Sequence, residues 1–292
     1  MAKRYYKVAE HQFSVDADED MFSLMQNYEP FIVNGADDAC DADAVFSLSI
    51  VQGAYVEYVE EMRQSEEGQD IICGHTAENL PTFEFVLRGV STGMLVCSKD
   101  YKSAKLYLPE EKSKTNKFSI DNALMVLYAL ATANLGTALF HAAVVTYQNR
   151  GYLFLGKSGT GKSTHARLWL RHIAGTELLN DDNPVVRFFE DGLCAKVYGS
   201  PWSGKTPCYK NMDAPLGGFV LLEQAPHNKI ERLRGVSAYA ALLPSISGKR
   251  WDRAIADGLH RIENSLASHV PVWHLECLPD EAAAKLCCET IA

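Results

Sequence analysis

Residues 152–163 read Tyr-Leu-Phe-Leu-Gly-Lys-Ser-Gly-Thr-Gly-Lys-Ser, an apolar run followed by a segment rich in glycine. The apolar run Tyr152 to Leu155 has the composition of a buried strand, and the residues from Lys162 to Ile173 have the pattern of a helix. Glycines between them allow the backbone to turn sharply. This order of strand, loop and helix predicts an α/β unit.

The glycine-rich segment has the spacing of a phosphate-binding loop, with Gly156 and Gly161 five residues apart and Lys162 and Ser163 directly after them. Glycines let backbone N–H groups point at a phosphate, and the following helix adds its positive N-terminal end. Lys162 would bind the β- and γ-phosphates, and Ser163 would bind magnesium. We expect the nucleotide to contact Gly156, Lys157, Ser158, Gly159, Thr160, Gly161, Lys162, Ser163 and Thr164.

The length of 292 residues suggests two domains, and the hydrophobic share of 47% is that of a folded protein. Residues 1–116 contain several β-rich runs separated by Gly, Asn and Asp, which predicts a mainly β domain of unknown role. Its expected strands are Phe31–Val33, Val45–Val51, Phe83–Leu87, Met94–Cys97 and Ala104–Leu108. The polar stretch from Pro109 to Lys114 is typical of a linker.

Residues 117–292 have the mixture of strands and helices expected of the nucleotide-binding domain. Ser119 is a candidate N-cap for its first helix, with Gly136 just past the end. The later strands are expected at 142–146, 185–189, 195–198, 218–222 and 270–276, and the later helices at 249–266 and from Pro279 onward.

Charge and composition exclude several classes of partner. The net charge of -9 argues against nucleic acid, because binding to phosphate backbones needs clustered Lys and Arg. No secretory signal is visible at the start, and the uncharged stretch from Asn122 to Asn149 is better explained by a buried helix and strand than by a membrane span. We therefore expect a cytoplasmic protein without membrane contact, whose scattered cysteines are reduced.

Two adjacent carboxylates, Asp181 and Asp182, follow the apolar residues 178–179. One could hold magnesium while the other accepts the proton of an attacking hydroxyl. The same residues also suit a polar turn before Pro184. Both interpretations remain open from the sequence.

Three further candidates lie before or after this pair in the sequence. His141 stands before the strand that precedes the loop strand, where a lone histidine is more often structural than catalytic. His165, on the helix after the loop, has no spacing that separates packing from a site role. The segment from Gly199 to Pro207 carries Lys205 and is typical either of a ligand-binding loop or of an ordinary exposed connection.

With His141-Ala-Ala-Val-Val, the loop, and Asp181-Asp182 in this order, residues 141 to about 222 resemble the catalytic domain of bacterial HPr kinase/phosphorylase. The resemblance implies a phosphoenolpyruvate-carboxykinase-like fold with a mixed sheet and flanking helices. It also implies ATP and Mg²⁺ as ligands, His141 and Lys162 in the catalytic site, and Asp182 as proton acceptor. Since that family forms hexamers, a homo-oligomer is implied as well.

The sequence departs from that family at two places. Lys196 stands where the family has a magnesium-binding glutamate, and the family's signature loop near an arginine is not recognisable. Lys205 occupies that region and could face the transferred phosphate. These departures put HPr itself in doubt as the substrate.

Three functions follow as hypotheses. The first is an ATP-dependent kinase that phosphorylates a hydroxyl on a protein serine or a small molecule. The second is a nucleotide-binding regulatory protein that has lost transfer, as Lys196 would allow. The third is an ordinary P-loop small-molecule kinase or ATPase, which predicts a parallel sheet and an arginine-rich lid.

Overall fold

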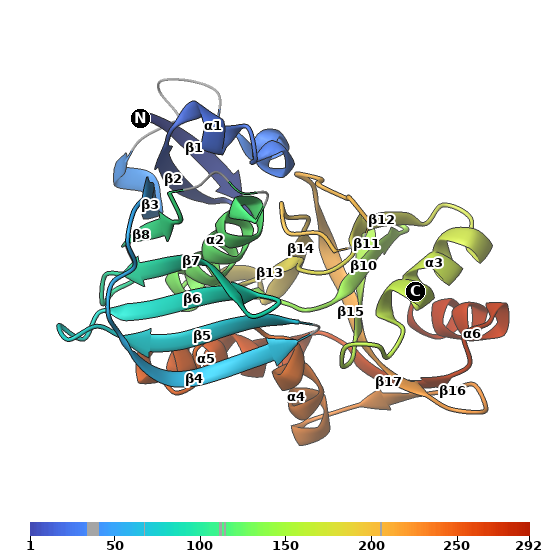
Figure 1. Cartoon of the computed structure of the whole chain (residues 1–292). Helices are drawn as coiled ribbons and strands as arrows, with labels where there is room; N and C mark the ends of the chain where they lie inside the picture. The colour runs from blue at the N-terminus through green and yellow to red at the C-terminus, as the bar shows by residue number, and fades with distance from the viewer. Residues whose placement is uncertain (34–40, 67, 111–112, 114, 205) are drawn as a thin grey trace. The chain divides into compact units, whose positions relative to one another are not determined.

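The computed structural model describes residues 1–33, 41–66, 68–110, 113, 115–204 and 206–292. The chain divides into two compact units, Met1–Ala131 and Thr132–Ala292. Each unit is built on one mixed sheet, so the protein is a strand-rich α/β protein with a few helices (Figure 1).

The first unit contains an eight-stranded sheet in the order β1-β2-β3-β8-β7-β6-β5-β4. The β2–β3 and β3–β8 pairs are parallel and the other pairs are antiparallel. The strands are β1 (Ala2–Val8), β2 (His11–Ala17), β3 (Ala44–Gln52), β4 (Val59–Glu66), β5 (Gln69–His75), β6 (Pro81–Leu87), β7 (Val90–Cys97) and β8 (Ser103–Leu108).

Helix α2 (Asn116–Thr132) packs on this sheet and corrects the prediction of an N-cap at Ser119. The Ser119 side chain is fully buried inside the helix and donates a hydrogen bond to Thr92 Oγ1 on β7 at 2.9 Å. The hydroxyl of Ser119 therefore satisfies its hydrogen bonding on the sheet and not at the helix N-terminus, which lies at Asn116. The division of the chain places α2 with the first unit, although the sequence suggested that it opens the second.

The strand predicted at Phe31–Val33 is wrong. Phe31 ends the 3-10 helix η1 (Gln26–Phe31), and Ile32 forms only an isolated bridge to Tyr6. Phe31 is buried, so its side chain packs in the hydrophobic core although the residue is not part of a β-strand. The remaining short helices of this unit are α1 (Glu19–Phe22) and η2 (Asp41–Asp43).

The second unit contains a sheet with strands in the order β12-β10-β11-β15-β14-β13-β9, to which β17 and β16 are added beside β15. Only β11–β15 and β15–β17 are parallel pairs. The strands are β9 (Thr137–Leu139), β10 (Ala143–Tyr147), β11 (Arg150–Leu155), β12 (Glu177–Asn180), β13 (Val185–Phe189), β14 (Cys194–Tyr198), β15 (Asp213–Gln224), β16 (Lys229–Leu233) and β17 (Val272–Cys277).

Helices α3 (Lys162–His172) and α6 (Glu281–Ile291) lie side by side on this sheet (Figure 1). Trp169 of α3 is fully buried in the core beneath them, against Tyr152 and Phe154 of β11. The other helices of this unit are α4 (Val236–Leu242), α5 (Arg253–His269), η3 (Glu190–Gly192) and η4 (Leu243–Ser245). This packing fixes the start of α3 at the end of β11.

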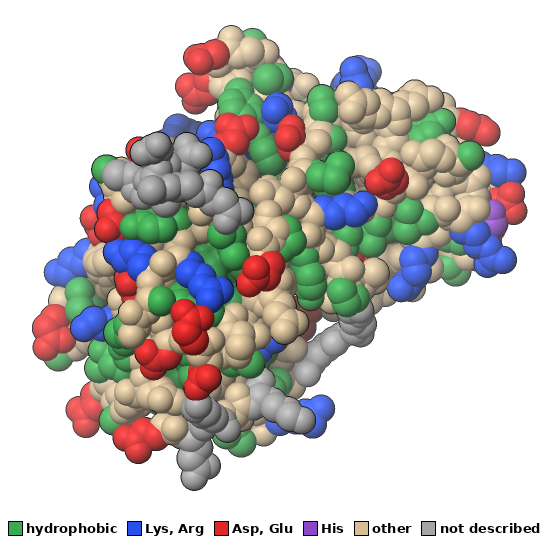
Figure 2. All heavy atoms as spheres, turned by 90° about the horizontal axis from the view of Figure 1, so that it is seen from above, with side chains coloured by type: hydrophobic (Ala, Val, Ile, Leu, Met, Phe, Trp, Pro, Cys, Tyr) green, Lys and Arg blue, Asp and Glu red, His purple; other side chains and the backbone are tan. Residues whose placement is uncertain are grey.

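The structure also bears on the expected partners. Among the helices of the described residues, none is both long and apolar enough to cross a membrane. The face drawn in Figure 2 carries acidic and basic side chains intermixed. No cysteine in the described part of the chain forms a disulfide.

Candidate functional site

Strand register brings the predicted site segments to one edge of the second sheet. Strand β10 lies between β11 and β12 and is antiparallel to both, with Ala143 opposite Phe154 and Val144 opposite Asn180. The start of β10 therefore lies beside the ends of β11 and β12. Each predicted site segment adjoins one of these strand ends. His141 comes just before β10, the glycine-rich loop directly follows β11, and the Asp181–Asp182 pair directly follows β12.

The loop after β11 has the backbone conformation that its glycines permit. Gly156, Gly159 and Gly161 have φ values of +145°, +78° and +108°, which residues with a side chain rarely adopt. Gly161 is the N-cap of α3, so the loop leads directly into the helix N-terminus. The loop therefore uses backbone conformations that favour glycine at these three positions, and it leads into the N-terminus of α3.

Lys162 is folded back onto this loop. Its ammonium group donates to the carbonyl oxygens of Gly156 at 2.9 Å and Lys157 at 3.3 Å, and the residue is only 8% exposed. The Thr160 hydroxyl donates to the same Lys157 carbonyl at 2.7 Å. The ammonium group is therefore held by backbone carbonyl oxygens of its own loop, and phosphate oxygens could replace them.

The remaining predicted loop residues differ in exposure. Lys157 and Ser158 are exposed, and Ser163 and Thr164 are half-buried in the first turn of α3. Gln224, which the sequence did not single out, donates to the Gly159 and Thr160 carbonyls at 3.2 and 3.3 Å. It is the last residue of β15, which is parallel to β11, so it ends at the same edge as the loop.

His141 and Asp182 form a direct pair. His141 Nδ1 lies 3.1 Å from Asp182 Oδ1, and both side chains remain about one third exposed, at 38% and 33%. The second oxygen of Asp182 accepts a hydrogen bond from Asn183 Nδ2 at 2.8 Å. The backbone N–H of Ala142 donates to the Asp182 carbonyl at 2.8 Å, which fixes the two segments to each other. The carboxylate is thereby oriented yet accessible to solvent.

Asn180 organises the turn that carries the two carboxylates. Its side-chain oxygen accepts from the backbone N–H groups of Asp182 and Asn183 at 2.8 and 2.9 Å, and its amide donates to Ser200 Oγ at 3.0 Å. The polar-turn interpretation is therefore correct for Asn180, which is fully buried. The sequence feature that could have predicted this turn is Asn180, because an Asn side chain often accepts a hydrogen bond from the backbone two residues later.

Asp181 is more buried than Asp182, at 7% exposure. It lies close enough to Cys208 to influence that thiol: burial raises the pKa of Cys208, Lys210 lowers it and Asp181 raises it. The two neighbouring carboxylates thus have different environments, one buried beside a thiol and one accessible and paired with histidine.

The loop that starts at Gly199 lies against the carboxylate turn. Ser200 is fully buried and donates to the Asn183 carbonyl at 2.6 Å, and Trp202 is also buried. A Cβ added at Gly204 would stand 3.1 Å from Asp182 Cβ. The serine and the indole therefore build the turn, and the prediction for Lys205 falls outside the described residues.

Lys196 forms an ion pair with Asp213 at 3.0 Å. The pair joins the antiparallel strands β14 and β15, where Tyr198 is opposite Asp213. The lysine that replaces the expected acidic ligand is therefore charge-compensated by a carboxylate on the neighbouring strand.

His165 has a packing role. It is 3% exposed, accepts a hydrogen bond from Trp169 Nε1 at 3.2 Å and packs edge-on against Phe154. Burial lowers its pKa from 6.5 to about 4, so the imidazole is neutral near pH 7.

The residues predicted to bind magnesium carry oxygen donors. Mg²⁺ prefers oxygen ligands and usually needs only one or two from the protein, with phosphates and water completing the shell. The Ser163 hydroxyl and the Asp181 carboxylate are donors of this kind. In the described residues, no group of three or more His, Cys, Asp and Glu side chains could hold a metal ion by itself.

The sequence matches no protein-family model and no curated protein. The likeness to HPr kinase/phosphorylase therefore rests on the motifs within residues 141 to about 222.

Proposed function

We propose that the chain is an ATP-dependent phosphotransferase that transfers the γ-phosphoryl group to a hydroxyl on a protein serine or a small molecule. One observation carries the proposal: the sheet edge that holds the Lys162 loop also holds the paired His141 and Asp182. A loop alone is shared by motors, switches and kinases, whereas an oriented, accessible carboxylate beside it supplies a base.

In this proposal the loop N–H groups and Lys162 bind the β- and γ-phosphates. Asp182 accepts the proton of the acceptor hydroxyl, whose oxygen bonds to the γ-phosphorus as the bond to the bridging oxygen of ADP breaks. His141 donates its Nδ1–H to Asp182 and orients the carboxylate. Magnesium held by Ser163 and Asp181 would neutralise charge on the phosphates. Positioning and charge stabilisation supply most of the rate.

The sheet supports this proposal over an ordinary P-loop kinase or ATPase. Such an enzyme predicts a parallel sheet, whereas β11 has parallel β15 on one side and antiparallel β10 on the other. A mixed sheet around the loop is what the carboxykinase-like fold implies.

The test is Asp182→Asn, assayed by transfer of radiolabelled γ-phosphate from Mg·ATP to acceptors in a cell extract. Loss of the base should reduce transfer by about 100-fold or more. Mg·ATP affinity should stay nearly constant. Asp191→Asn, an exposed carboxylate in η3, is the matched control and should retain full transfer. Transfer by Asp182→Asn at the native rate would exclude Asp182 as the base.

A second function, nucleotide binding without transfer, is favoured by the Lys196–Asp213 ion pair. An ammonium in place of the family's glutamate removes one oxygen ligand for magnesium. Titration calorimetry that finds tight Mg·ATP binding, together with no labelled product in any extract, would support a regulatory protein over the kinase.

A further inference from the structure

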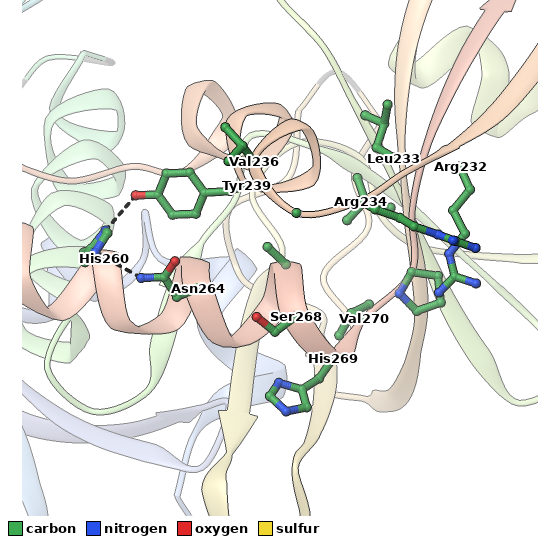
Figure 3. A pocket seen from close by; sticks show the side chains of 14 residues that line it. Arg232, Leu233, Arg234, Val236, Tyr239, His260, Asn264, Ser268, His269 and Val270 are labelled. Carbon is green, nitrogen blue, oxygen red and sulfur yellow. Dashed lines mark hydrogen bonds between the residues drawn. The ribbon is translucent and has the colours of Figure 1, made fainter.

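A cavity of about 740 Å³ lies in the second unit (Figure 3). No residue of the glycine-rich loop 156–163 lines it. Its walls come from three segments: the end of β16 with the turn into α4, the C-terminal half of α5, and the residues that lead into β17. Its volume is within the range of pockets that bind small molecules.

Two arginines give the cavity a positive wall. Figure 3 shows Arg232 and Arg234 reaching the same side of the cavity. Arg232 lies over the Trp273 ring, with its guanidinium carbon 5.6 Å from the ring centroid. Within the described ranges, neither arginine forms an ion pair with a carboxylate, and no Asp or Glu lines the cavity. Two uncompensated guanidinium groups in a chain of net charge -9 favour an anionic ligand.

A chain of hydrogen bonds fixes the opposite wall. The Tyr239 hydroxyl donates to Glu263 at 2.9 Å and lies 2.8 Å from His260 Nδ1. The hydroxyl has one hydrogen, which it donates to Glu263, so it accepts a hydrogen bond from the Nδ1–H of His260. The other ring nitrogen of His260, Nε2, then accepts a hydrogen bond from the Asn264 amide at 3.0 Å. Glu263 is fully buried and is held by Arg250 at 2.6 Å. These polar groups are therefore pre-organised.

The cavity lies at the opposite edge of the sheet from the loop. On β15, Phe219 pairs with Val272 at the start of β17, whereas Gln224 contacts the loop. Five residues of strand span about 16 Å. A ligand in the cavity is too distant to receive a phosphoryl group at the loop, so the cavity is a separate site.

We propose that this cavity binds a small organic phosphate, a phosphate monoester, at a second site. The phosphate would lie on Arg232 and Arg234, because a guanidinium fork matches two phosphate oxygens. The organic part would contact the amide of Asn264, the hydroxyl of Ser268 and the apolar side chain of Val270, all of which line the cavity. Phosphate binding through arginines and an organic body against polar and apolar groups are both typical of small-molecule sites.

The test is titration calorimetry on the full chain carrying Lys162→Ala, which removes the loop ammonium as a competing phosphate ligand. Glycerol 3-phosphate and inorganic phosphate are the probes. Adding Arg232→Ala or Arg234→Ala should weaken binding of glycerol 3-phosphate about tenfold or more. Arg253→Ala is the matched control, because its side chain is on α5, is 95% exposed and does not line the cavity.

Three results would overturn the proposal: no detectable binding of glycerol 3-phosphate, native affinity in Arg234→Ala, or inorganic phosphate binding as tightly as the ester. The last result would mean that the cavity does not recognise the organic part of the ligand. Both arginines are exposed, so circular dichroism is expected to show folded variants. The outcome is independent of the proposed transferase, which is tested at Asp182.

Discussion

At the scale of single residues, Lys162 is held by the carbonyl groups of its own loop. Phosphate oxygens are stronger partners for an ammonium than carbonyls, because they carry charge. We expect Lys162→Ala to weaken Mg·ATP binding by about tenfold to 100-fold, measured by titration calorimetry.

Lys99→Ala is the matched control for Lys162→Ala, since Lys99 is an exposed lysine of the first unit. It should bind Mg·ATP with native affinity. Equal binding by Lys162→Ala and the native protein would contradict the assignment of the loop as the nucleotide site.

His165 makes stability depend on pH. Its folded-state pKa of about 4 lies below its ordinary value of 6.5, so the unfolded chain binds a proton first as pH falls. The free energy of unfolding should therefore decrease from pH 6.5 to pH 4, by about 3 kcal/mol at most. Urea unfolding at several pH values should show a shallower decrease in His165→Gln than in the native protein.

The control for this pH series is Leu170→Ala, an exposed change on the same helix that removes no titratable group and should leave the native slope unchanged. Identical pH slopes for His165→Gln and the native chain would mean that the imidazole of His165 is not held neutral by burial.

At the scale of elements, α3 is anchored by Trp169, which contacts the rings of Tyr147, Tyr152 and Phe154. Because this side chain is fully buried, Trp169→Ala should lower the free energy of unfolding by about 3–5 kcal/mol, measured by urea unfolding. Leu170→Ala, on the exposed side of the same helix, should change it by about 0.5 kcal/mol or less. Similar losses in both variants would contradict this orientation of α3.

Elements with a regular pattern could be predicted and those with unusual turns could not. The strands β3, β6, β7 and β8 were expected from their alternating or continuous apolar residues. The β1–β2 hairpin was missed, because its turn residues Ala9 and Glu10 adopt φ values of +46° and +66°. Such angles usually require Gly, Asn or Asp, so the sequence carried no turn signal.

At the scale of the whole molecule, two units with separate sheets need not respond together to a ligand. Mg·ATP bound at the loop should slow hydrogen exchange at 156–172 and 181–183, and leave strands β1 to β8 unchanged. Mass spectrometry of peptides from the full chain measures both regions at once. Protection confined to the first unit would place the nucleotide elsewhere.

The loop, its strand and its helix could be predicted from the sequence alone, because glycine conformations, lysine charge and helix patterning are local properties. The sequence also indicated His141 and Asp182, which the family resemblance implies to be in one catalytic site. The folded structure is needed to show that these two side chains meet and that Gln224 supports the loop, because antiparallel and parallel register bring distant strand ends to one edge. It is likewise needed to show that His165 packs in the core, since burial is a property of the assembled sheet and helices.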